Sequence, residues 1–98
     1  MYLNLHSYMA EEKNKNLLDQ EMTKKAQQAT LRMAKEWQKS EATIHHAIKS
    51  YEDVIRVDSE SAEAGEARSA LLKIAEDWDK KGQKYAAVKL YKKLMVGR

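Results

Sequence analysis

Histidine is the residue type in this 98-residue chain best suited to chemistry, and it occurs as His6, His45 and His46. His45 and His46 are adjacent, so on a helix their side chains point about 100° apart and do not easily share one metal ion. Glu41 and His45 lie four residues apart and offer two ligands on one helix face. Zinc normally takes three or four ligands. We therefore predict no metal site and interpret the adjacent pair as surface or groove-edge histidines.

The remaining composition also argues against catalysis. The chain has no cysteine, which excludes a thiol nucleophile and a disulfide. Its three glycines, Gly65, Gly82 and Gly97, do not form a loop that could cradle phosphate. The sequence therefore predicts a protein that is not an enzyme and that carries no cofactor.

Charge is unevenly distributed along the chain, although the formal net charge is only +3. Residues 41–67 carry two basic and seven acidic groups, whereas residues 68–98 carry nine basic and three acidic groups. A basic end of this kind can meet an acidic peptide, a nucleic acid or a lipid surface. The favoured interpretation is a solvated helix face with cations near its C-terminus, where the helix dipole stabilises them. No nucleic-acid partner is expected, because the lysines are not interleaved with aromatic residues outside the apolar pattern.

The sequence also bears on location. No run approaches the ~20 apolar residues that cross a bilayer. The start, MYLNLHSYMAEEK, lacks the basic and long apolar regions of a signal peptide. We expect no membrane span and a cytoplasmic protein, or a periplasmic one if a signal segment was removed.

An internal repeat defines the elements that carry these residues. AQQATLRMAKEWQK (26–39) aligns with ARSALLKIAEDWDK (67–80) at an offset of 41 residues. AIKSYEDVI (47–55) then aligns with AVKLYKKLM (87–95) at an offset of 40. The two tryptophans, Trp37 and Trp78, are therefore equivalent, and their place on the apolar pattern indicates packing rather than ligand stacking. Self-similarity at such a period is typical of stacked-repeat proteins.

Apolar residues spaced by three and four predict four main helices, and the absence of proline supports an all-α fold. Ser40, the segment Asp58–Ser61 and Gly82 offer the caps and stops between the helices. Short turns between helices predict antiparallel hairpins. The four apolar stripes are Leu18, Met22, Ala26, Ala29, Met33 and Trp37; Ile44, Ala47, Ile48, Tyr51, Val54 and Ile55; Ala64, Ala67, Leu71, Ile74 and Trp78; and Tyr85, Val88, Tyr91, Leu94 and Met95.

The predicted organisation has two parts. Residues 1–16 form an N-terminal helix or extension, with a short helix over Tyr2–Met9 ahead of the polar stretch Glu11–Asn16. Residues 17–98 form the repeat domain, with repeat one over about 17–58 and repeat two over about 61–96.

The order of residue types within each hairpin resembles the tetratricopeptide repeat (TPR). The second copy has Leu71, Ile74, Ala75, Trp78, Gly82, Ala87, Tyr91 and Leu94, and the first has Met33, Ala34, Trp37, Ala47, Tyr51 and Val54 in six of these eight places. Thr30 stands in the place of Leu71, and Glu41 or Ala42 replaces the turn glycine. The stretch AIKSYEDVIRVDSESAEA (47–64) is especially similar. A standard repeat spans about 34 residues, so these two copies are lengthened. The resemblance implies hairpins stacked as a short right-handed superhelix.

The resemblance also implies a concave groove, lined by the first helix of each hairpin, that binds a peptide or a helix. The known pattern for clamping a chaperone's carboxylate tail is not reproduced, because Lys35 stands where asparagine is expected and Leu31 where lysine is expected. The partner is therefore a protein or peptide of unknown identity. The groove positions are Gln28, Leu31, Lys35, Gln38 and Lys39 in copy one and Ser69, Leu72, Glu76, Asp79 and Lys80 in copy two.

Two function classes follow. The first is a small adaptor or scaffold that binds a protein segment in its groove. The second is a structural oligomerisation module whose groove is filled by its own N-terminal helix or by a second chain. Repeat arrays usually need about three units, and only two are clear here, so self-association into a homo-oligomer is expected. A third class, electrostatic binding through residues 80–98, is weaker.

Overall fold

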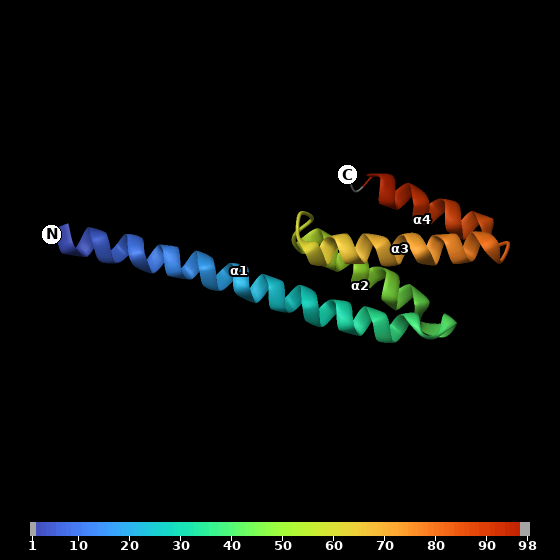
Figure 1. The fold of residues 1–98 in the computed structure, drawn as a ribbon, viewed down its shortest axis with the longest axis horizontal. Coiled ribbons are helices and arrows are strands. Elements are labelled where there is room, and N and C mark those ends of the chain that lie inside the picture. Colours follow the sequence, from blue (N-terminus) through green and yellow to red (C-terminus); the bar gives the residue numbers. More distant parts are fainter. Residues whose placement is uncertain (1, 97–98) are drawn as a thin grey trace.

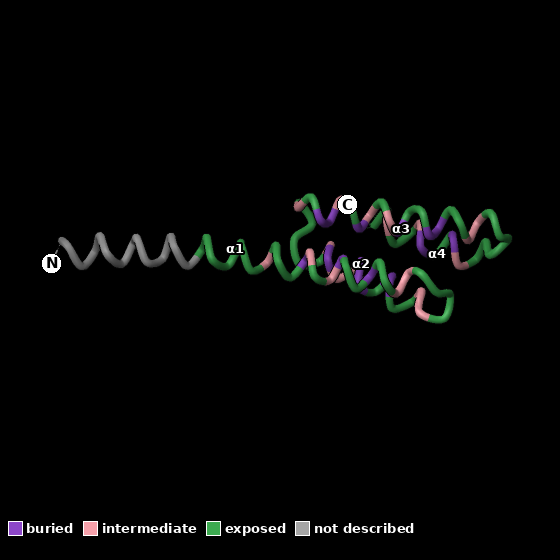
Figure 2. Tube along the Cα trace, turned by 60° about the horizontal axis from the view of Figure 1, so that its bottom comes forward, coloured by how far each residue is buried: buried purple, intermediate pink, exposed green. Residues whose placement is uncertain are grey.

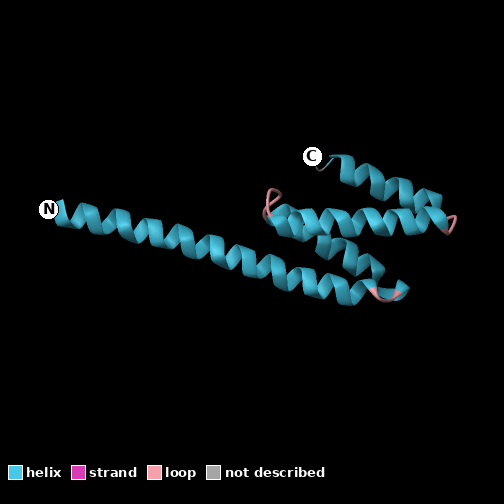
Figure 3. Ribbon diagram, viewed as in Figure 1, coloured by secondary structure: helices cyan, strands magenta, loops and turns pink. Residues whose placement is uncertain are grey.

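The computed structural model describes the backbone of residues 2–96 and the side chains of residues 16–96. It contains helix α1 (Tyr2–Gln38), a short 3₁₀ turn η1 (Glu41–Thr43) and helices α2 (Ile44–Val57), α3 (Ala62–Lys80) and α4 (Lys84–Val96). Within residues 2–96 every regular element is helical (Figure 3), which confirms the all-α prediction.

The helices form two hairpins that lie side by side. α1 packs on α2, α3 packs on α4, and α2 packs on α3 between the hairpins. Figure 1 shows α1 running far beyond the other three helices, and the principal axes measure 69 × 25 × 15 Å. The expected pair of antiparallel helical hairpins is therefore present.

α1 is one continuous helix of 37 residues. The prediction of a separate N-terminal helix ahead of Glu11–Asn16 is wrong for the backbone. That polar stretch contains neither proline nor glycine, so nothing in its residue types interrupts the hydrogen-bonded helix. The side chains of residues 1–15, including His6, lie outside the described residues.

The turns use the predicted capping residues. The Ser40 Oγ accepts a hydrogen bond from the Ala42 N–H at 3.2 Å, at the start of η1. The Ser61 Oγ accepts one from the Ala64 N–H at 3.0 Å, at the start of α3. Gly82 follows the end of α3 with a φ of 85°, a left-handed conformation that glycine adopts without a steric penalty.

Small residues let the paired helices approach closely. Ala34 on α1 and Ala47 on α2 are fully buried, and their repeat equivalents Ala75 and Ala87 are buried as well. Figure 2 shows the buried positions gathered where the helices meet, while the described part of α1 that projects from the bundle is mostly exposed. The hairpin contact is therefore built alike in both copies.

The two long helices bury different stripes. In α3 the predicted stripe is confirmed, since Leu71 and Ile74 are buried. In α1 the predicted stripe is wrong: Leu18, Met22 and Met33 are at least half exposed. α1 instead turns Gln27, Leu31 and Ala34 toward its neighbours, because α2 and α3 lie on that side of it.

Candidate protein-interaction surfaces

The α1 half of the predicted groove is occupied by contacts within the protein. The Gln28 amide donates to the Glu63 carboxylate at 3.3 Å, and the Lys35 ammonium lies 2.6 Å from the Glu66 carboxylate. Both partners belong to α3. These two α1 side chains therefore help to join the first hairpin to the second.

The end of α1 is engaged in the same way. The Gln38 Oε1 accepts a hydrogen bond from the Tyr51 hydroxyl of α2 at 2.5 Å. The Lys39 ammonium lies 3.0 Å from the Glu36 carboxylate, in an exposed pair three residues apart. Such a surface pair contributes at most about 1 kcal/mol, so Lys39 is the member of this half that remains free to meet a partner.

Leu31 corrects the predicted groove. Its side chain is only 4% exposed and belongs to the central hydrophobic cluster. α3 covers the side of α1 on which the groove was predicted, so Leu31 is a core residue and no peptide can reach it. Its equivalent in the second copy, Leu72, is 44% exposed.

The α3 half of the predicted groove is open. Ser69, Leu72, Glu76 and Lys80 are all exposed on one side of α3. Asp79 is half-buried, and its carboxylate lies 2.9 Å from the Lys84 ammonium of α4. Equivalent residues of the two copies thus differ in environment, since one set faces α3 and the other faces solvent.

Two partly apolar surfaces flank the core. The first, which we call the α3–α4 face, is formed by Leu72, Val88 and Met95, all at least 44% exposed. The second, which we call the α1 face, is formed by Ala26, the half-buried Thr30 and Met33, of which Met33 is 50% exposed. Exposed apolar side chains on such surfaces are candidates for interaction sites.

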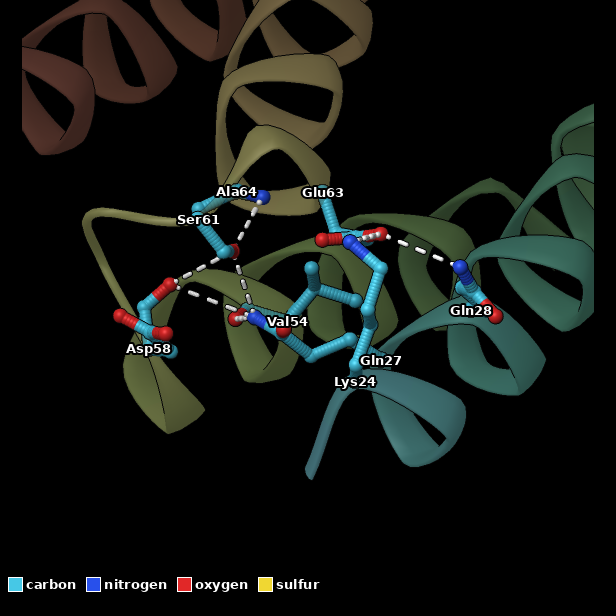
Figure 4. Close-up of polar contacts among 8 residues, drawn as sticks. All are labelled: Lys24, Gln27, Gln28, Val54, Asp58, Ser61, Glu63 and Ala64. Atoms are coloured by element: carbon cyan, nitrogen blue, oxygen red, sulfur yellow. Dashed lines mark hydrogen bonds and ion pairs between the residues drawn. The ribbon is translucent and has the colours of Figure 1, made fainter. Parts of the chain in front are cut away.

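A polar network fixes the geometry between the hairpins (Figure 4). The buried Gln27 amide of α1 donates to the Val54 carbonyl and the Ser61 hydroxyl, each at 2.9 Å, and lies 3.2 Å from the Asp58 carbonyl. These acceptors belong to α2, to the α2–α3 turn and to the cap of α3. One side chain therefore ties three helices together.

An ion pair extends this network. The Lys24 ammonium lies 3.2 Å from the Glu63 carboxylate at the start of α3 (Figure 4). The pKa of Glu63 is lowered, first because its own backbone N–H donates to the carboxylate and then because Lys24 and Gln28 do. The charged form of Glu63 is thus the one that the folded protein stabilises.

Electrostatics also mark the contact between α1 and α3. Hydrogen bonding to Glu66 raises the pKa of Lys35, as expected for an ammonium that gains a carboxylate partner. Burial raises the pKa of the Tyr51 hydroxyl, which remains a neutral donor to Gln38. The ammonium of Lys35 thus pairs across the two hairpins, while the Tyr51 hydroxyl joins α2 to α1 within the first hairpin.

The turn end of the bundle contains an open cleft of about 410 Å³. Gln38 and Lys39 line it together with His45, Asp77 and Trp78. The ring of His45 lies 6.1 Å from that of Trp78, and the ring of His46 lies 5.2 Å from that of Trp37. The histidines are exposed while both tryptophans pack against the core, and in each pair the imidazole is tilted by 46° to the indole.

No metal centre is formed by these groups. Among residues 16–96 no three histidine, aspartate or glutamate side chains gather as a metal would require.

No helix in the described part of the chain has both the length and the apolar character needed to cross a bilayer.

Sequence reasoning missed Gln27, which is a buried polar residue rather than an apolar one. A signal was present, because Gln27 lies one turn before Leu31 and two before Ala34, on a stripe that excludes the exposed Met33.

Comparison with protein families, with curated proteins and with solved structures found no match.

Proposed function

We propose that this protein is a non-enzymatic interaction module of the TPR type, which binds a helical segment of a protein partner. The observation that carries the proposal is the difference between Leu31 and Leu72. The two leucines are equivalent in the repeat, and the first is covered by a helix while the second is exposed. Because α3 covers Leu31, the surface around its exposed equivalent Leu72 is suited to bind a helix in the same way.

The α3–α4 face is the proposed binding surface. Its leucine, valine and methionine provide apolar area, while Glu76 and Lys92 at its border are exposed and can select a partner by charge. This placement moves the proposed site from the concave groove as a whole to its open α3 side and the neighbouring side of α4.

The protein's own N-terminal helix does not cover this face. α1 is continuous to Gln38 and makes no close backbone contact with α4 within residues 2–96. Figure 1 shows α1 and α4 on opposite sides of the α2–α3 pair. Of the two forms of the oligomerisation alternative, the structure therefore favours a second chain.

A photo-crosslinking amino acid at position 72 tests the proposal, with position 73 as the matched control. Lys73 is the exposed neighbour on α3, and its repeat equivalent Arg32 remains exposed although α3 covers Leu31. Crosslinks to a defined segment, mapped by mass spectrometry, are expected from position 72 and not from position 73. Equal or absent crosslinking at both positions, in purified protein and in cell extract, would contradict the proposal.

Salt separates this function from electrostatic binding by residues 80–98. Binding of a polyanion through lysines weakens steeply as salt rises. A contact through Leu72, Val88 and Met95 is expected to vary little between low and moderate salt, because apolar burial dominates it. Crosslinking at position 72 that disappears with added salt would favour the electrostatic alternative.

A further inference from the structure

We propose that the helix bound by the α3–α4 face is α1 of a second copy of this chain, so that copies associate head to tail. The inference rests on the proposed function and names its partner. The contact between the first and second hairpins serves as the template, because the repeat assigns its main apolar residues equivalents on the two faces.

The first half of the template lies on α1 and α2. The residues there that are covered by the second hairpin have apolar equivalents on the α3–α4 face, and these equivalents are exposed. The pairs are Leu31 and Leu72, Ile48 and Val88 (7% and 47% exposed), and Ile55 and Met95 (half-buried and 71% exposed).

The second half of the template lies on α3. The α3 residues that are buried against the first hairpin have more exposed equivalents on the α1 face. The pairs are Ala67 and Ala26, Leu71 and Thr30, and Ile74 and Met33 (3% and 50% exposed). Each face therefore corresponds in position to one half of a contact that the protein already makes internally, with the polar Thr30 in the place of Leu71.

Charge supports the same pairing. In the internal contact Lys35 of α1 pairs with Glu66 of α3. At an offset of 41 residues their equivalents are Glu76 on α3 and Lys25 on α1. Stacking a second copy would place opposite charges together again, with the signs exchanged.

A second ion pair behaves in the same way. Glu52 of α2 lies 3.8 Å from the ammonium of Lys93 of α4. At an offset of 40 residues their equivalents are Lys92 and Asp53. Two of the four ion pairs between the hairpins thus keep complementarity with both signs exchanged.

The other ion pairs between the hairpins raise no conflict. Lys24 and Glu63 have the equivalents Gly65 and Met22, so no like charges meet. The pair of Glu41 and Lys81 lies where the offset changes from 41 to 40 and has no unique equivalent. Exposed ion pairs contribute little energy, so apolar burial supplies the affinity and the charges set the register.

The association is heterologous, because each copy uses a different face toward each neighbour. Heterologous contacts build rings or open chains rather than closed dimers. Blocking one face of every copy should therefore prevent assembly at the concentrations where the wild type first assembles, whereas two differently blocked variants should still form a 1:1 complex.

Leu72→Glu and Met33→Glu provide these blocked variants. Both residues are at least 44% exposed, so the charge is tolerated in the monomer, and circular dichroism checks the helix content. Sedimentation of the wild type is expected to show species that grow with concentration. At the concentrations where the wild type first assembles, each variant alone should remain at 11.3 kDa, because the desolvated carboxylate in the contact weakens self-association roughly tenfold or more.

The mixture of the two variants is the decisive measurement. It should give a complex of one Leu72→Glu chain with one Met33→Glu chain that does not grow further, since the remaining faces are blocked. A wild type that stays monomeric, a single variant that still dimerises, or a mixture that stays monomeric would each overturn the proposal.

The register is tested by exchanging one charge pair. Glu76→Lys and Lys25→Glu should each weaken association about three- to fivefold, and the double variant should recover it, as the size of surface ion pairs suggests. A double variant that self-associates no more tightly than the more weakly associating of the two single variants would overturn the assigned register.

The outcomes also separate this inference from the proposed function. If position 72 crosslinks to a different protein while the wild type stays monomeric, helix binding stands and the second copy is excluded as its partner. If position 72 crosslinks to nothing above its control and the wild type stays monomeric, both proposals fail.

Discussion

α1 and α3 have closely similar sequences and yet bury different sides. Leu31 is buried in α1 while its equivalent Leu72 is exposed in α3, and Ile74 is buried in α3 while its equivalent Met33 is half exposed in α1. α3 lies between α2 and α4, while within residues 2–96 α1 has neighbouring helices only on the side of α2 and α3. The comparison shows that, in a stacked repeat, the neighbour on each side decides which apolar residues become core.

The first prediction concerns Leu31 and Leu72, the equivalent leucines that differ in exposure. Leu31→Ala should lower the free energy of unfolding by about 2–5 kcal/mol, because it leaves a cavity in the core. Leu72→Ala should cost less than about 1 kcal/mol in dilute protein, since the side chain is already partly solvated. Urea denaturation of both variants measures the difference.

One result for the same two variants would contradict this comparison. Equal losses for the two variants would mean that Leu72 is covered in solution. If that equality appeared only at high protein concentration, it would support association through the α3–α4 face.

The four helices and their turns could be predicted from the sequence because those signals are local. Ser61 and Gly82 act through their own hydrogen bonds and dihedral angles, and the apolar spacing fixes the helix type. The buried side of α1 could not be predicted in this way. Leu31 and Met33 are both apolar, and only the position of α3 decides between them.

The candidate site was predictable in part for a related reason. The repeat located equivalent positions correctly, but equivalence implied the same environment for Leu31 and Leu72, which the structure does not give. An internal helix fills one position and solvent meets the other. Sequence similarity between copies identifies the contact type, and the place of each copy in the stack decides whether that contact is made.

The second prediction compares the polar residues at another equivalent pair, Gln27 and Arg68. Gln27→Ala should cost about 1–3 kcal/mol, because it removes a buried donor from the Val54 carbonyl and the Ser61 hydroxyl. Arg68→Ala should cost less than about 1 kcal/mol, since its hydrogen bond of 3.1 Å to the Ser59 carbonyl is exposed.

Thermal and urea unfolding of the two variants test this pair. A loss for Arg68→Ala as large as that for Gln27→Ala would show that the second copy makes the same junction as the first. That result would remove the asymmetry between the copies.

The third prediction concerns the start of α3, where Ser61 is the N-cap. The equivalent position in α1 is Gln20, which caps nothing because α1 continues through it. Ser61→Ala should cost about 1–2 kcal/mol, because it removes both the N-cap and one acceptor of the buried Gln27 amide. Gln20→Ala, in the interior of α1, should be nearly neutral. Circular dichroism melts of the two variants distinguish a true cap from a sequence coincidence.

The smallest expected effect is the pH dependence that arises from Glu63, whose equivalent in α1 is the uncharged Met22. The pKa of Glu63 is lower in the folded protein than its ordinary value of 4.5, so folding favours the carboxylate. The corresponding stability is fully present above about pH 4.5 and is lost as pH falls through the folded pKa. Glu63→Gln should therefore unfold with a shallower dependence on pH below this value, and Lys24→Met should show part of that change. Urea midpoints from pH 7 down to pH 3 measure both slopes, and a Glu63→Gln slope as steep as that of the wild type would show that this carboxylate does not link the two hairpins.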